Sequence, residues 1–179
     1  KVYKNLKKNK KFKIIHVGII KKKYDLSIYN NLEKVIINSK PNLIINASGQ
    51  VNIDKCESQP KKSKVINVKL LENIFKIKRA KNLKFNLIQF STDQLYDQSS
   101  NKASKESDKV RINNLYSKQK YMAEKICMNN NSLVLRVNFY GNSKKNKSFL
   151  NWVYDSFKSK EKFYLFNDVF FNPLSVNTL

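Results

Sequence analysis

Five short apolar runs, several of them rich in β-branched residues, alternate with segments of helical periodicity along most of the chain. Such runs are typical of buried strands in a parallel sheet, and the helical segments between them are typical of crossover helices. Strands are expected at residues 13–20, 43–47, 85–90, 133–137 and 163–166, helices at 1–10, 31–38, 64–80, 114–128 and 149–157, and a polar loop at 97–109. The sequence therefore predicts an α/β fold with a doubly wound, Rossmann-like parallel sheet.

The composition allows a buried core and carries a large positive charge. Of 179 residues, 41% are hydrophobic and 12% aromatic, which is enough to build a core. The 36 Lys and Arg against 13 Asp and Glu give a formal net charge of +23. Only three of these basic residues are arginine, the better residue for bidentate contacts with phosphates and bases, and the lysines are spread along the whole chain. We expect non-specific attraction to polyanions but no specific nucleic-acid partner.

The remaining composition bears on compartment and on metals. Cys56 and Cys127 are too few for a disulfide framework and fit a reducing compartment. No apolar run approaches the roughly 20 residues that span a bilayer, and the single histidine, His16, excludes a His-rich metal site. We expect a cytoplasmic protein with no metal and no membrane partner.

Small and polar residues follow two of the predicted strands, where ligands of such sheets bind. Asn46, Ala47 and Ser48 end one strand and precede Gly49, which lets a flat or phosphorylated ligand approach the backbone. Thr92 follows the next strand and could hydrogen-bond a substrate carbonyl. Taken alone, the first segment fits a simple turn equally well, and the segment at Thr92 fits a helix cap or turn better than a binding role.

A tyrosine and a lysine share one face of the next predicted helix. Tyr116 and Lys120 are four residues apart, so their side chains lie on the same side. A phenol has a pKa of about 10, and a neighbouring ammonium lowers it, which makes proton transfer feasible near neutral pH. In a chain so rich in lysine the pair alone is weak. The order of all three motifs along alternating strands and helices is a much stronger signal.

This order of motifs resembles the extended short-chain dehydrogenase/reductase superfamily and, within it, the dTDP-4-dehydrorhamnose reductases. The similarity covers nearly the whole chain. Residues 41–47 resemble the family's PDxVINA motif, and residues 51–57 its AVDxAE motif. Residues 66–68 match a V-N pair, and residues 91–97 resemble its STDYVFD motif. Residues 135–141 resemble the strand and turn after its Tyr-Lys helix.

The resemblance implies an NAD(P)-dependent oxidoreductase that reduces the keto carbon of a nucleotide-linked 4-keto sugar. Tyr116 would donate the proton, Lys120 would lower the pKa of Tyr116 and hold the nicotinamide ribose, and Thr92 would position the carbonyl oxygen. The NAD or NADP cofactor would contact Asn46, Ala47, Ser48, Tyr116, Lys120 and Asn138, with Asp25 toward its adenine end. Residues 1–145 would form the dinucleotide-binding domain and residues 146–179 the beginning of a substrate-binding region. Asp25 fits a helix cap equally well.

One residue separates subclasses of this superfamily. The related 4,6-dehydratases place an acidic pair after the threonine, whereas here Gln94 follows Asp93, and a carboxamide cannot act as a general acid. A reductase is therefore favoured over a dehydratase. An NAD-dependent epimerase and a non-catalytic regulatory member of the fold stay open as alternatives. The sequence also leaves open the choice between NAD and NADP, the identity of the sugar, and whether the protein is a homodimer.

The glycine-rich turn of the superfamily has no counterpart in the sequence. Its glycines let backbone amides at a helix N-terminus contact the cofactor pyrophosphate, but Gly18, Gly49 and Gly141 are far apart. We expect this turn upstream of residue 1, and the similarity at the other end stops before a further substrate-domain helix. We therefore expect a fragment, truncated at both ends, that binds the cofactor poorly on its own.

Overall fold

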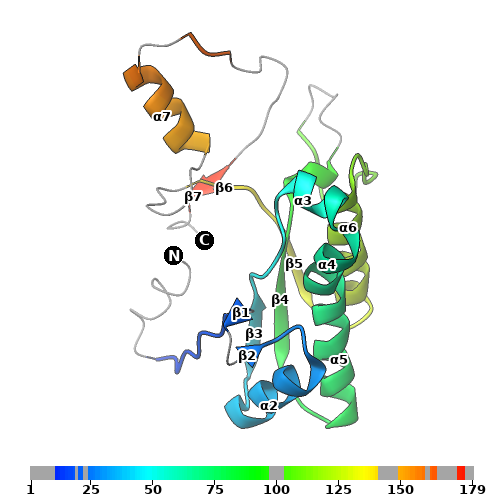
Figure 1. Cartoon of the computed structure of the whole chain (residues 1–179). Coiled ribbons are helices and arrows are strands. Elements are labelled where there is room, and N and C mark those ends of the chain that lie inside the picture. Colours follow the sequence, from blue (N-terminus) through cyan, green and yellow to red (C-terminus); the bar gives the residue numbers. More distant parts are fainter. Residues whose placement is uncertain are drawn as a thin grey trace. The chain divides into compact units, whose positions relative to one another are not determined.

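The computed structural model describes residues 11–18, 20–21, 24–96, 103–140, 149–159, 162–164 and 173–175 (Figure 1). The chain divides into two compact units. Ile15–Arg136 form one, here called the sheet unit, and Lys1–Ile14 with Val137–Leu179 form the other, called the terminal unit. The assignment of residues 1–145 to a dinucleotide-binding domain and of 146–179 to a substrate-binding region remains a prediction.

A three-stranded parallel sheet forms the centre of the sheet unit. Its strands are β3 (Leu43–Asn46), β4 (Asn86–Ser91) and β5 (Leu133–Arg136), in the order β3-β4-β5. In this register Asn46 lies opposite Gln89, and Ser91 lies opposite Arg136. The predicted strands at 43–47, 85–90 and 133–137 are confirmed to within a residue, and so is the α/β class with a parallel sheet.

One long helix connects β3 to β4. It consists of α4 (Pro60–Lys64), the π-helical turn η1 (Val65–Lys69) and α5 (Leu70–Ala80). Pro60 occupies the first helical turn, where its missing N–H costs nothing. The helix therefore begins four residues before the predicted start at residue 64. The change to i→i+5 hydrogen bonds within η1 is a feature that apolar spacing does not predict.

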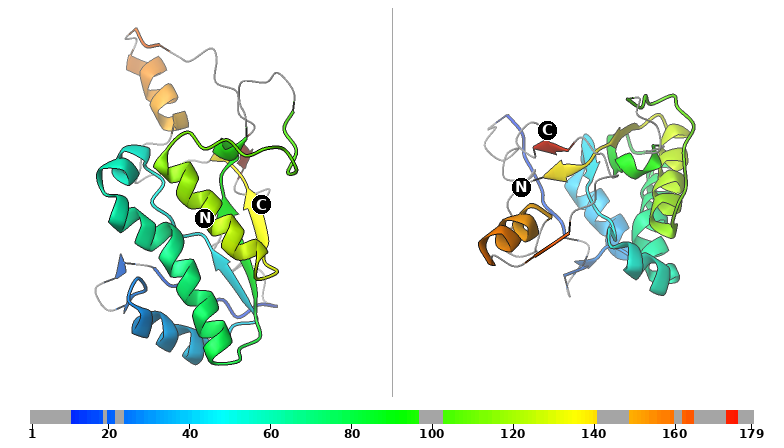
Figure 2. Two further views of the ribbon diagram at one scale, coloured as in Figure 1. Left: turned by 90° about the vertical axis from the view of Figure 1, so that its right-hand side faces the viewer. Right: turned by 90° about the horizontal axis from the view of Figure 1, so that it is seen from above.

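The other helices of the sheet unit are α2 (Tyr29–Ser39), α3 (Ile53–Ser58), α6 (Leu115–Met128) and the 3-10 turn η2 (Asp93–Leu95). The predicted helices at 31–38 and 114–128 are confirmed. A capping box starts α6, because the Asn114 side chain accepts from the Ser117 amide at 2.8 Å and the Ser117 hydroxyl accepts from the Asn114 amide at 3.2 Å. The left view of Figure 2 shows α5 and α6 side by side on one face of the sheet.

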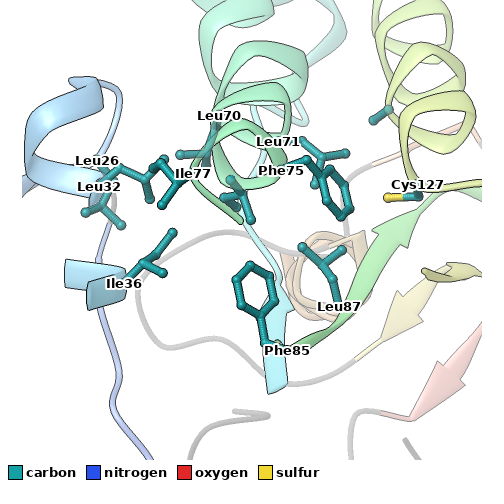
Figure 3. Packing of buried hydrophobic residues seen from close by; sticks show 12 residues of the cluster. Leu26, Leu32, Ile36, Leu70, Leu71, Phe75, Ile77, Phe85, Leu87 and Cys127 are labelled. Carbon is teal, nitrogen blue, oxygen red and sulfur yellow. The ribbon is translucent and has the colours of Figure 1, made fainter. Parts of the chain in front are cut away.

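The core of the sheet unit lies between α5, α2 and β4. Figure 3 shows Leu32 and Ile36 of α2, the labelled side chains of α5, and Phe85 directly before β4 and Leu87 within it gathered in this core. The buried side chains of α5 are Leu70, Leu71, Ile74, Phe75 and Ile77. Of these, Leu70, Ile74 and Ile77 follow one another at the helical spacing of three or four residues. Each such side chain contributes roughly 1.5–3 kcal/mol by leaving water. The buried cluster consists of Leu26, Leu32, Ile36, Leu70, Leu71, Ile74, Phe75, Ile77, Phe85, Leu87, Ala123 and Cys127.

The predicted buried strand at residues 13–20 is wrong. Residues 12–18 have no regular secondary structure, and Ile15 is 52% exposed. Only β1 (Ile20–Lys21) forms, and it pairs antiparallel with β2 (Tyr24–Asp25). A β-branched run becomes a buried strand only where a neighbouring strand supplies hydrogen bonds, and no described residue pairs with 12–18 in this way.

Among its described residues, the terminal unit has two short strands and one helix. β6 (Phe139–Tyr140) pairs parallel with β7 (Leu174–Ser175), and α7 (Phe149–Ser159) confirms the predicted helix at 149–157. Trp152 and Phe157 of α7 make edge-on ring contacts with Phe163 at centroid distances of 5.8 and 5.1 Å.

Several predicted segments lie partly or wholly outside the described residues. The helix predicted at 1–10 lies outside them entirely. Residues 162–164 have no regular secondary structure, and the rest of the strand predicted at 163–166 is not described. Residues 103–109 are neither helix nor strand, as the predicted loop requires, and residues 97–102 are not described. Within the described chain, no helix has the length and apolar character needed to cross a bilayer.

Candidate active site

The end of β4 and the first turns of α6 bring together the three residues predicted to be catalytic. Thr92 follows the last residue of β4, and α6 packs along β4 and β5 with Tyr116 and Lys120 on its inner face. All three side chains are buried, with 5 or 6% of their surface exposed. The spacing of four residues therefore places the phenol and the ammonium on the sheet side of the helix, as expected.

Thr92 acts on the protonation of Tyr116, because its side chain favours the charged form of the phenol. The Thr92 hydroxyl donates to Asp93 Oδ1 at 3.4 Å and accepts from the Gln94 amide at 3.3 Å. Burial raises the pKa of Tyr116 and the carboxylate of Asp93 adds to the rise, although Thr92 opposes it. This direction corrects the expectation that Lys120 lowers the pKa of Tyr116. Desolvation of the phenolate is the larger effect here.

Lys120 is a buried ammonium held at the same strand end. Its Nζ donates to the carbonyl oxygen of Phe90 at 2.6 Å. Burial lowers its pKa from 10.5 to about 8, while the neighbouring Glu124 and Cys127 favour the charged form. Near neutral pH the side chain is therefore still charged, next to the strand end that carries Thr92.

Gly49 brings the loop after β3 close to this ammonium. A Cβ at position 49 would lie 3.7 Å from Lys120 Nζ and 3.4 Å from Asn67 Oδ1. Glycine therefore leaves free space beside the ammonium where any other residue would place a side chain. The structure thus brings the end of β3, predicted to contact the cofactor, together with Lys120.

Asn46 contributes to this loop through internal hydrogen bonds. Its Nδ2 donates to Gln89 Oε1 at 2.7 Å, and its Oδ1 accepts from both the amide and the hydroxyl of Ser48. The side chain of Asn46 therefore shapes the turn, while Ala47 is exposed and Ser48 half-buried. Direct contact of these three residues with a cofactor remains a prediction.

A buried polar network behind the loop was not predicted from the sequence. Asn67, within η1, accepts from the Gln50 amide at 2.7 Å and donates to the Gln50 carbonyl at 3.1 Å. Its Nδ2 also donates to Gln119 Oε1 at 2.8 Å, and Gln119 Nε2 donates to Ser63 Oγ at 2.9 Å. One asparagine thus connects the loop after β3 to the helix that carries Tyr116 and Lys120. The sequence does contain one sign of this network, because Asn67 is a polar residue between the apolar Ile66 and Val68 of the predicted helix at 64–80.

The other two predicted cofactor residues make hydrogen bonds within their own segments. Asp25 accepts from the Ser27 amide at 2.9 Å, and its carbonyl accepts from Asn31 Nδ2 at 3.2 Å. Hydrogen bonding from the side chain and the amide of Ser27 lowers the pKa of the Asp25 carboxyl. Asp25 therefore shapes the turn before α2. Asn138 belongs to the terminal unit, where its carbonyl accepts from the Leu174 amide at 2.9 Å. The cofactor role of both remains a prediction. Among the described residues, no three His, Cys, Asp or Glu gather as a metal site would require.

Solved structures with the same fold include dTDP-4-dehydrorhamnose reductases. A dTDP-4-dehydrorhamnose reductase from Clostridium acetobutylicum superposes with a TM-score of 0.85 at 22% identity, over 98% of this chain and 61% of that one. A hypothetical dTDP-4-dehydrorhamnose reductase from Sulfolobus tokodaii gives 0.75 at 25% identity, over 92% and 58%. The enzyme from Bacillus anthracis, in complex with NADP, gives 0.66 at 21% identity, over 80% and 51%.

The chain is thus shorter than these relatives, spanning 51 to 61% of their length. A comparison with curated proteins gave no match. The family model for the RmlD substrate binding domain matches residues 2–179, nearly the entire chain. With the parallel sheet and the Thr-Tyr-Lys cluster, this match shows that the chain belongs to the RmlD substrate binding domain family.

Proposed function

We propose that the protein containing this chain is an NAD(P)-dependent reductase of the short-chain dehydrogenase/reductase type, acting on a nucleotide-linked 4-keto sugar. The observation that carries the proposal is the burial of Thr92, Tyr116 and Lys120 at the end of β4, where the Lys120 ammonium donates to the Phe90 carbonyl. Its family membership and the NADP in the Bacillus anthracis relative support it. The partner we propose is a nucleotide sugar, and the compartment the cytoplasm.

Reduction of a ketone requires a hydride at carbon and a proton at oxygen. NADH or NADPH would supply the hydride when bound. Tyr116 would supply the proton, and its raised pKa suits this role because the phenol stays protonated at neutral pH. The Thr92 hydroxyl, whose side chain acts on the protonation of Tyr116, would hold the carbonyl oxygen next to the proton donor. Lys120 would hold the nicotinamide ribose, because its ammonium lies close to the Gly49 backbone in the loop after β3.

The residues around Lys120 fit the nicotinamide-ribose half of a dinucleotide. Ala47 and Ser48 lie at the carboxyl end of a parallel strand, the usual ligand position in such sheets. The space that Gly49 leaves beside the Lys120 ammonium suits a ribose whose hydroxyls accept hydrogen bonds. A glycine-rich turn for the pyrophosphate is not present in the part of the chain that the structure describes. Ala47, Ser48, Gly49 and Lys120 would therefore bind only the nicotinamide-ribose half of the cofactor.

Replacement of Tyr116 by phenylalanine tests the proposal. With purified full-length protein, NADH or NADPH and a dTDP-linked 4-keto sugar, we expect Tyr116→Phe to lower kcat by about 100-fold or more, because the phenyl ring cannot donate a proton. The measurement is the loss of NAD(P)H absorbance. Tyr121→Phe is the matched control, since Tyr121 lies on the same helix but half-buried, with its ring against Lys125.

Two outcomes would contradict the proposed reduction. Unchanged activity of Tyr116→Phe would mean that the cluster has no catalytic role, as in a non-catalytic regulatory member of the fold. Conversion of the sugar nucleotide without net consumption of NAD(P)H would identify an epimerase, which oxidises and then reduces the same carbon.

A further inference from the structure

A buried ion pair lies on the same face of α6 as the proposed catalytic residues. Glu124 follows Lys120 by four residues and Tyr116 by eight, and only 1% of its surface is exposed. Its Oε1 accepts from Arg136 Nε at 3.0 Å, and its Oε2 accepts from Nη2 at 2.8 Å. Arg136 is the last residue of β5, so the pair fixes α6 to the end of the sheet.

Arg136 also reaches the segment that follows Thr92. Its guanidinium lies over the ring of Tyr96, 5.2 Å from the ring centroid. Its Nη1 donates to the carbonyl of Glu106 at 3.4 Å. Tyr96 directly follows η2, the turn for which Thr92 is the N-cap. One guanidinium therefore connects the turn that begins at Thr92 to the helix that carries Tyr116.

Glu124 is also the acidic group that acts on Lys120. The other groups near the Lys120 ammonium are the Cys127 thiol on α6, the Phe90 carbonyl on β4 and the neutral Gly49. The Glu124 carboxylate raises the pKa of Lys120 against the effect of burial. Removal of this charge would therefore favour the neutral amine.

Stability alone is a weak explanation for such a pair. The cost of removing both charges from water offsets much of their attraction, and well-packed apolar residues of similar volume often serve as well or better. The exposed pair Lys69–Glu72, at 2.7 Å, carries no such desolvation cost and makes no contact with the cluster.

We propose that Glu124 and Arg136 are positioning residues for the reaction at Tyr116. Arg136 fixes the turn that begins at Thr92 against α6, and Glu124 keeps Lys120 charged. Neither residue touches the reacting groups. This inference rests on the proposed function, because it assigns a role in that same reaction.

The first test is the pH profile of Glu124→Gln, which keeps the shape of the side chain and removes its charge. We expect the alkaline limb of kcat/KM to move to lower pH, so that at pH values well above the limb activity falls about tenfold for each unit by which the Lys120 pKa drops. Glu72→Gln, which breaks the exposed pair, leaves the profile unchanged. A variant with reduced stability only would lose active protein without moving the limb.

Arg136→Lys separates the two roles. It keeps a positive charge beside Glu124 but loses the bidentate contact and the planar stacking on Tyr96. We expect kcat to fall several-fold while the alkaline limb stays in place. Wild-type kinetics in both variants would overturn the inference. So would loss of the cooperative thermal unfolding transition in both, because the pair would then be needed for stability alone.

A measurement that does not depend on activity separates this inference from the proposed function. NMR titration of the lysine Nζ signals, with Lys120→Arg to assign the resonance, reports the charge of Lys120 directly. We expect a lower pKa in Glu124→Gln than in wild type and no change in Glu72→Gln. A wild-type protein that turns over no nucleotide 4-keto sugar would refute the proposed function. An unshifted Lys120 signal in Glu124→Gln would refute the inference in either case.

Discussion

Burial determines the protonation states of the two central residues. Tyr116 and Lys120 lie on one helical face, but the Lys120 Nζ is bonded to the Phe90 carbonyl, and each pKa shifts toward its neutral form. A phenol that stays protonated suits a proton donor in ketone reduction. The sequence shows that the two groups share a face. It does not show how much water remains around them, which is why the predicted direction of the Tyr116 pKa shift is wrong.

The lowered pKa of Lys120 predicts a rise of stability with pH. Between its folded pKa of about 8 and its unfolded value of 10.5, the unfolded chain binds more protons than the folded one, so the group's contribution increases as the pH rises. From pH 8 to about pH 10 we expect a gain of about 2 kcal/mol in the free energy of unfolding, relative to Lys120→Met. Urea denaturation of both proteins at the two pH values measures it.

The control for this titration is Lys118→Met. Lys118 lies on the same helix but is exposed, and its removal should leave the pH dependence of the wild type in place. An equal pH dependence in wild type and Lys120→Met would show that Lys120 keeps its ordinary pKa in the folded protein.

At the scale of elements, the pattern of apolar and polar residues predicts the bounds of a strand correctly where a neighbouring strand is present. It predicts a strand wrongly where that neighbour is missing among the described residues. The strands at 43–46, 86–91 and 133–136 are short apolar runs between polar segments, and their bounds follow from that contrast. The run at 13–20 has the same composition but lacks a described neighbour and does not form a strand at 12–18. The start of α4 at Pro60 could have been predicted from the preference of proline for the first helical turn.

The candidate site was predictable only where it lies in contiguous motifs. Thr92, Tyr116 and Lys120 were named from short segments that follow consecutive elements, and the structure places them together. The network of Asn67 and Gln119 joins residues 52 positions apart, and no local pattern encodes that distance. Its detection requires the register of η1 against α6.

Asn67→Ala tests whether this network holds the elements in place. The substitution leaves the Gln50 amide and Oε1 of the buried Gln119 without their Asn67 partner, so we expect a loss of about 2–4 kcal/mol in the free energy of unfolding. Chemical denaturation measures it. Asn86→Ala is the control, since Asn86 is exposed at the start of β4 and its loss should cost no more than about 0.5 kcal/mol. Equal stability of the two variants would show that the network contributes little.

For the whole molecule, the net charge of +23 predicts binding without specificity. Lysines spread along the chain attract phosphates by counterion release but do not read bases. We expect two DNA duplexes of unrelated sequence to bind with equal affinity, and both affinities to fall steeply with salt. Fluorescence anisotropy at several salt concentrations measures this. A preference above tenfold for one duplex at physiological salt would contradict it.

The π-helical turn at Val65–Lys69 has a consequence for how this chain can vary. Each residue of an α-helix advances the face by about 100°, so deletion of one residue to make the connection regular would rotate α4 and Asn67 away from the partners they now meet, while α5 kept its face on the core. A regular α-helix at this point would have ideal backbone geometry but would lose the Asn67–Gln50 hydrogen bonds that hold the loop carrying Gly49. Variants of this chain can therefore exchange side chains along residues 60–80 far more readily than they can change the length of that segment.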